Sequence, residues 1–114
     1  MSKYVLNPKL KQSATEEIFN LLLSFIQIGK SYKTLSGGKT HKIIKVKGEV
    51  TIERTDANDK PEINFDEINK VIKLFKDGDS YNTSSEEYKK QLLKPIHKTP
   101  LLSILLASDI IVKK

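Results

Sequence analysis

The sequence predicts an α+β fold in which a small, mostly antiparallel sheet of three to four strands packs against N-terminal and C-terminal helices. Apolar residues recur at helical spacing before residue 29 and after residue 64, whereas residues 31–54 show the shorter alternation that is typical of strands. The length of 114 residues suits a single domain, residues 1–114, that buries one core between two layers.

The first helix is expected at residues 14–28. Ser13 precedes Glu16 by three positions, which is the spacing of a capping box at a helix start. Apolar residues then recur three and four positions apart as far as Ile26, as they do on one face of a helix. We expect Gly29 to end this helix, because glycine is common just after a helix.

After this helix we expect three short antiparallel strands, at residues 31–35, 41–47 and 49–54. In the second strand, Ile44 and Val46 are expected to face the core, and the lysine that follows each of them is expected to face solvent. Residues 62–64 provide a short fourth strand.

The C-terminal half predicts three further helices. A helix at residues 65–76 opens with Asn64 as its cap and repeats apolar residues along one face. A third helix is expected at residues 83–94. A fourth follows Thr99, is apolar on nearly every side and is therefore expected to be buried. Residues 110–112 are expected to form a terminal strand or to dock on the core as an apolar tail.

Composition excludes several classes of chemistry. The chain has no cysteine, which excludes disulfides, thiolate zinc sites, iron–sulfur clusters and a cysteine nucleophile, and which fits a reducing cytoplasm. The apolar runs fall far short of the roughly 18 residues needed to cross a bilayer. Residues 1–9 do not resemble a secretion signal, so we expect a cytoplasmic protein with no membrane partner.

The net charge of +6 is unevenly distributed. Residues 1–48 hold nine lysines against two acids, residues 49–87 hold five bases against eleven acids, and residues 88–114 hold six lysines against one acid. Six lysines share one stretch without acids, namely Lys30, Lys33, Lys39, Lys42, Lys45 and Lys47. Such a cluster attracts a phosphate backbone, and the alternative is an ordinary solvated surface. Arg54 is the one arginine, so phosphate contacts are expected to outweigh contacts to base edges.

Two features of the lysine cluster have competing interpretations. Tyr32 could stack on a base or pack at the rim of the sheet. The tripeptide Gly38-Lys39-Thr40 ends like a phosphate-binding loop, but Lys33 stands where that motif requires its first glycine. A hairpin turn is therefore the favoured interpretation of this tripeptide.

The sequence does not predict catalysis. His41 and His97 are the only histidines, and neither has a second metal ligand three or four positions away. Lys47, Glu49 and Glu53 supply the residue types of a metal nuclease, but their order does not match a nuclease signature. We therefore predict no catalytic residues, no metal and no cofactor, with a small enzyme as the least favoured class.

Several motifs follow one another in a recognisable order. They are Tyr32-Lys33-Thr34-Leu35-Ser36-Gly37, Ile43-Ile44-Lys45-Val46, Val50-Thr51-Ile52-Glu53-Arg54, a capped helix beginning near Phe65, a Gly78 turn with Thr83, and Thr99-Pro100-Leu101-Leu102-Ser103-Ile104-Leu105-Leu106-Ala107. This order resembles the small accessory module that stands beside nuclease domains in some restriction and HNH-type endonucleases. The resemblance covers residues 32–107 and implies DNA engagement without catalysis, because the nuclease half and its His-Asn-His residues are absent here. A free-standing copy would also fit a regulator, an inhibitor of a defence system or a subunit of a larger machine.

We predict a non-catalytic accessory or regulatory domain, a monomer or homodimer, that binds nucleic acid through phosphates, with duplex DNA as first ligand and RNA as second. The predicted anchors are Lys33, Lys39, Lys42, Lys45 and Lys47, with Thr34, Ser36 and the amides of Gly37 and Gly38 as phosphate donors. An irregular helix-turn-helix could add the lysines of the third helix, Lys89, Lys90 and Lys94. The alternative is a protein-interaction module, or an inhibitor from a phage or mobile element. It would hold a host protein or defence complex through residues 49–87 or through exposed apolar side chains.

Overall fold

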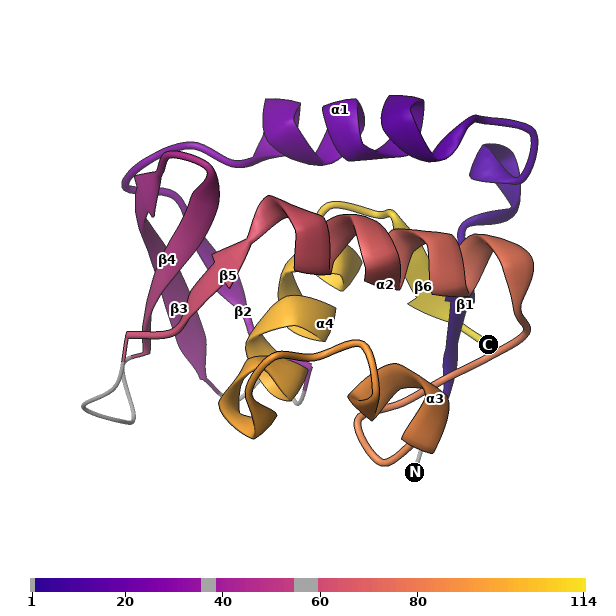
Figure 1. The fold of residues 1–114 in the computed structure, drawn as a ribbon. Coiled ribbons are helices and arrows are strands. Elements are labelled where there is room, and N and C mark those ends of the chain that lie inside the picture. Colours follow the sequence, from indigo (N-terminus) through magenta and orange to yellow (C-terminus); the bar gives the residue numbers. More distant parts are fainter. Residues whose placement is uncertain (1, 36–38, 55–59) are drawn as a thin grey trace.

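A computed structural model describes residues 2–35, 39–54 and 60–114 of the chain. It confirms the α+β class (Figure 1). The strands are β1 (Tyr4–Leu6), β2 (Ser31–Lys33), β3 (Thr40–Val46), β4 (Glu49–Arg54), β5 (Glu62–Asn64) and β6 (Ile111–Lys113). The helices are α1 (Thr15–Phe25), α2 (Phe65–Asp77), α3 (Glu86–Lys89) and α4 (Lys98–Ala107), with the short 3-10 helices η1 (Pro8–Leu10) and η2 (Pro95–His97).

The described strands form two separate antiparallel sheets. β2, β3, β4 and β5 make a four-stranded sheet in that order, as the sequence predicts. β1 was not predicted, and it pairs with β6 in a two-stranded sheet in which Val5 lies opposite Val112. Figure 1 shows the two sheets at opposite ends of the fold, with α2 and α4 between them and α1 packed on α2.

The inner face of the four-stranded sheet is apolar. On this face Ile43 lies opposite Ile52, and Val46 lies opposite Val50. The register shifts between these two pairs, because Ile44 is an extra residue that forms a β-bulge. The expected regular alternation through Ile44 and Val46 is therefore wrong, since the bulge gives the inner positions to Ile43 and Val46, three positions apart.

Helix α4 lies at the centre of the core. Residues 100–105 are all buried, as the apolar sequence predicts. The elements β2, η2 and β6 all contact this helix. The hydroxyl of the buried Ser103 accepts a hydrogen bond from the N–H of Leu35 at 3.1 Å, which fastens the end of β2 to α4. Among the helices that the structure describes, none combines the length and the apolar character needed to cross a membrane.

Local capping determines where the longer helices start. Asn64 caps α2 as predicted, because its Oδ1 accepts a hydrogen bond from the N–H of Glu67 at 2.8 Å. The N-cap of α1 is Ala14, whose N–H donates to Oε1 of Glu17 at 3.5 Å. The capping pair of α1 is therefore one position later than the pair predicted to begin at Ser13.

Helix α1 ends earlier than predicted, at Phe25 instead of residue 28. Ile26 is already extended, with φ −73° and ψ 113°. The chain then turns toward β3, where the N–H of Gly29 donates to the carbonyl of Ile43 at 2.7 Å. Gly29 has a φ of +90°, which residues with a Cβ rarely adopt. Glycine at position 29 is therefore needed for the turn into the sheet, and it does not end the helix.

The prediction of a helix over residues 83–94 is wrong, because α3 covers Glu86–Lys89 alone. Lys94 precedes Pro95 and is extended, with φ −141° and ψ 142°, which is the backbone conformation that a following proline favours. A helix of four residues is too short to lie along a DNA groove as a recognition helix does. We therefore discard the helix-turn-helix interpretation.

The core should depend strongly on Leu101, which is fully buried in α4. Leu101→Ala leaves a cavity, so we expect the free energy of unfolding to fall by about 2–5 kcal/mol. Urea denaturation followed by circular dichroism measures the loss. Leu21 on α1 is the matched control, because its side chain is 50% exposed. Leu21→Ala should change stability by less than about 0.5 kcal/mol, and equal losses for the two variants would contradict the central position of α4.

Candidate nucleic-acid interface

The outer face of the four-stranded sheet carries the lysines of β2 and β3. Lys42 lies opposite Ser31 of β2 and opposite Glu53 of β4. Lys33 shares this outer face, because residues two apart in a strand point to the same side. The β-bulge brings Lys45 to the same face. All three lysines are exposed, so the structure groups three of the predicted anchors on one surface.

Two further lysines mark the ends of β3. Lys39 precedes the strand, Lys47 follows it, and both are exposed. The distance along the strand between them is about 25 Å at 3.2–3.4 Å per residue. This length corresponds to about seven base pairs of a duplex. Lys47 follows the inward Val46 and so shares the outer face, whereas Lys39 lies at the turn end of β3, where strand alternation does not place it on that face. We call the five exposed side chains together the lysine face: Lys33, Lys39, Lys42, Lys45 and Lys47.

Acidic side chains of β4 adjoin the lysine face. Nζ of Lys45 lies 3.9 Å from Oε1 of Glu49, and Glu53 lies opposite Lys42. The pair of Lys45 with Glu49 is partly exposed, so it holds the lysine only weakly. The outer face of the sheet is therefore divided into a basic half on β2 and β3 and an acidic half on β4.

Of the other predicted phosphate donors the structure describes Thr34 alone, and Thr34 does not lie on the lysine face. Thr34, directly after β2, is only 8% exposed and lines a pocket. Its N–H donates to the carbonyl of Lys39 at 2.9 Å and so closes the hairpin of β2 and β3. Ser36, Gly37 and Gly38 lie outside the described residues. Of the predicted anchors and donors, the described part of the hairpin therefore exposes the lysines and not Thr34.

Tyr32 and His41 face the core. They lie opposite one another on β2 and β3, and their rings meet edge to face with centroids 5.7 Å apart. Burial raises the pKa of Tyr32 above its usual value, and no hydrogen-bond partner for its hydroxyl lies among the described residues. The packing interpretation of Tyr32 is confirmed, and its ring is not available to stack on a base.

A buried contact between a carboxylate and an imidazole, which was not predicted, links α2 to η2. Nδ1 of His97 lies 2.8 Å from Oε2 of Glu67, and both side chains are at most 2% exposed. Burial and the charge of Glu67 raise the pKa of nearby Tyr88, whose hydroxyl donates to the carbonyl of Lys98 at 2.6 Å. The sequence held a signal for this site, because Glu67 stands four positions before Val71 on the apolar face of α2.

A carboxylate beside an imidazole is a pair that can exchange a proton, as in general acid–base catalysis. Glu67 and His97 are both closed off from solvent, so no substrate reaches them in this conformation. Oε1 of Glu67 has no hydrogen-bond partner within the described parts of the chain. We interpret the pair as a structural link between two elements of the core.

Comparison with known proteins gives no further guide, because no family model, curated protein or solved structure matches the chain. The resemblance to the endonuclease accessory module stays a prediction. The function of the lysine face is therefore inferred from its geometry and charge.

The contact between Glu67 and His97 can be tested by removing one of its two side chains. His97→Ala leaves the carboxylate of Glu67 buried without its counterpart, so we expect the free energy of unfolding to fall by about 3–5 kcal/mol. Glu67→Met combined with His97→Leu removes the buried charge and should restore much of this loss. Urea denaturation of both variants at pH 7 measures the difference. A double variant no more stable than His97→Ala would show that the pair does not act as described.

Proposed function

We propose that this domain binds nucleic acid, in the first place duplex DNA, by contacts to the phosphate backbone and without catalysis. The observation that carries the proposal is the position of Lys33, Lys42 and Lys45 on one side of the sheet, where all three are exposed. Figure 1 shows α2 and α4 on the inner side of this sheet. A phosphate backbone could therefore approach the lysines from the outer side.

Charge and geometry favour backbone contacts over base recognition. Each phosphate of a duplex that a lysine neutralises adds about 0.9 to the slope of log affinity against log salt. Five lysines therefore predict a slope no steeper than about −4.5. Arg54, the one arginine of the sequence, is half-buried on the inner face opposite His41. Bidentate contacts to guanine are not expected from that position.

The position of Tyr32 favours a duplex over single-stranded RNA. Proteins that bind single strands without sequence preference use aromatic side chains on which bases stack. Tyr32 points into the core, so it offers no stacking surface to a strand on the lysine face. The phosphates of a duplex need no such surface.

The variant with Lys42→Glu, Lys45→Glu and Lys47→Glu reverses three charges of the lysine face. We expect its affinity for a random-sequence duplex to fall on the order of a hundredfold or more, because attraction to phosphates becomes repulsion. The three side chains are exposed, so the fold should be retained. Fluorescence anisotropy with the duplex and with a matched RNA, each at two salt concentrations, measures the effect.

The matched control carries the same change of charge elsewhere. Lys89→Glu, Lys90→Glu and Lys94→Glu replace exposed lysines in and after α3. This control should lose much less affinity than the lysine-face variant. Equal losses would mean that net charge alone drives binding, and wild-type affinity in the lysine-face variant would rule the proposal out.

Glu53→Gln removes a negative charge opposite Lys42 with almost no change in side-chain size. We expect the affinity for the duplex to rise about two- to fivefold, which is the range of a single interaction between surface charges. Glu16→Gln is the control, because Glu16 is exposed in the first turn of α1, away from the four-stranded sheet (Figure 1). The same anisotropy titration compares the two, and an affinity unchanged by Glu53→Gln would place the nucleic acid elsewhere.

A second candidate function is binding of a protein partner. Leu93 is 63% exposed and Ile96 is 42% exposed, both in the segment between α3 and α4. Apolar side chains that are this exposed to solvent are suited to the core of a protein interface. Lys94 and Lys98 are exposed in the same region, so an acidic partner would fit, such as a host protein or defence complex. Failure of both duplex and RNA to bind at low salt would make this the first candidate.

A further inference from the structure

A pocket of about 440 Å³ opens between the end of β2, the start of α4 and the two-stranded sheet. Its walls include Tyr4 of β1, Thr34 and Leu35 after β2, Asn82 before α3, Thr99 of α4 and Lys113 of β6. Pockets that hold small molecules have volumes of roughly 300–1,000 Å³. The proposed binding of nucleic acid makes no use of this pocket.

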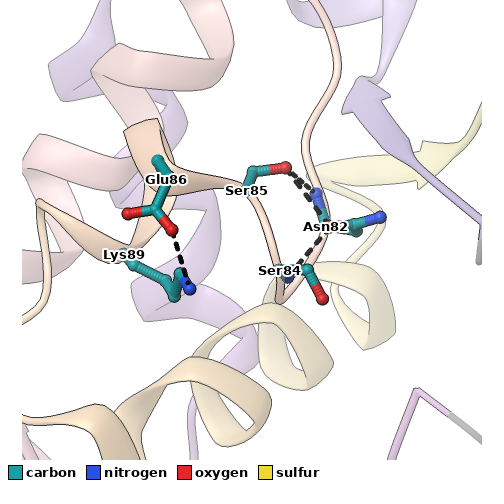
Figure 2. Close-up of polar contacts among 5 residues, drawn as sticks. All are labelled: Asn82, Ser84, Ser85, Glu86 and Lys89. Carbon is teal, nitrogen blue, oxygen red and sulfur yellow. Dashed lines mark hydrogen bonds and ion pairs between the residues drawn. The ribbon is translucent and has the colours of Figure 1, made fainter.

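Asn82 lines the pocket and carries a hydrogen-bond donor on its side chain. Its Oδ1 accepts hydrogen bonds from the N–H of Ser84 at 2.9 Å and from the hydroxyl of Ser85 at 3.3 Å. These bonds identify the oxygen of the side-chain amide and leave its nitrogen on the other side. Figure 2 shows this nitrogen pointing away from both serines.

The side-chain donor of Asn82 is unused within the described residues. Asn82 is only 8% exposed, and its Nδ2 has no hydrogen-bond partner among the described residues. A side-chain donor at a pocket wall that has no acceptor in the protein is satisfied by water or by a ligand. The hydroxyls of Tyr4 and Thr99 belong to residues that line the same pocket. Three residues with neutral hydrogen-bond donors therefore line one space.

The charge of the pocket is positive. Lys113 lines it, and none of the described lining residues is an aspartate or a glutamate. Thr99 lies in the first turn of the ten-residue α4, where the helix dipole adds partial positive charge. Leu35 and the ring of Tyr4 supply an apolar wall.

We propose that this pocket binds a small organic anion, a phosphate monoester or a carboxylate carried on an aromatic or apolar body. The anionic group is placed against Lys113 and the donors of Asn82 and Thr99, because hydrogen bonds to an ionised acceptor are the stronger ones. The body lies against Tyr4 and Leu35. Pockets with an apolar wall and a few convergent polar groups are typical small-molecule sites.

Phenyl phosphate, phenylacetate and inorganic phosphate are the probes, and NMR spectra of the ¹⁵N-labelled full chain record their binding. We expect saturable shifts with at least one organic anion, centred on the side-chain amide of Asn82 and on the backbone amides of Thr83 and Thr99. Inorganic phosphate should bind at least tenfold more weakly, because it lacks the apolar body. The tighter of the two organic probes identifies the anionic group. Absence of saturable shifts at millimolar probe, or shifts centred on the lysine face, would overturn the proposal.

Asn82→Asp is the sharpest variant. It keeps the oxygen that accepts from Ser84 and Ser85 but replaces the donating nitrogen by a charged oxygen. We expect at least a tenfold loss of affinity for the probe with the fold unchanged, and unchanged affinity would refute the site. Lys113→Gln is a second variant, and it leaves the turn at Asn82 unchanged. We expect it to lower the affinity for the probe several-fold. Lys114→Gln is the matched control, since Lys114 contacts Ser80 and is not part of the pocket lining.

This inference does not rest on the binding of nucleic acid. The lysine-face triple variant is expected to bind the probe as the wild type does. Asn82→Asp is expected to retain its affinity for the duplex. The two proposals can therefore fail separately, and loss of probe binding in the lysine-face variant would count against the pocket.

Discussion

Helix α4 is stable only where all of its sides are covered, because residues 100–105 present no polar face to solvent. The chain meets this requirement with elements from both of its halves, since β2, η2 and β6 all contact the helix. The two sheets consequently lie at opposite ends of the fold (Figure 1). The hydrogen bond from the N–H of Leu35 to the hydroxyl of Ser103 is directional, so it sets the position of β2 along the helix.

The lysine face follows from the same packing. Once one side of the sheet is packed on the helices, alternate side chains of β2 and β3 must point outward. In a regular strand Lys42 and Lys45, three positions apart, would lie on opposite faces. The extra residue Ile44 corrects this odd spacing and keeps both lysines outside, while Ile43 and Val46 stay inside. One inserted residue therefore preserves both the core and the charged surface.

Features that depend on neighbouring residues were predictable from the sequence. Helix α2 is the clearest case, because the cap at Asn64 and the apolar spacing are local, and the helix exceeds its predicted range by one residue. Strand β1 was not predictable, because its three residues show no pattern and its partner lies at the other end of the sequence. The candidate sites divide in the same way. Strand alternation predicts that Lys45 and Lys47 are exposed, whereas the place of Lys42 on the same face depends on the β-bulge. The pair of Glu67 with His97 and the pocket around Asn82 join segments that meet only after folding.

The pairing of β1 with β6 determines how the fold responds to mechanical force. Tyr4 lies opposite Lys113, and the N–H of Lys114 donates to the carbonyl of Lys3 at 3.0 Å, so this ladder begins beside both chain ends. Hydrogen bonds of an antiparallel pair run across the strands. A pull on the two chain ends therefore loads the hydrogen bonds of this ladder one after another. Strand β6 is peeled away from β1, and the ladder is not sheared as a whole. The two-stranded sheet opens first under tension, and the four-stranded sheet carries no load until it has opened.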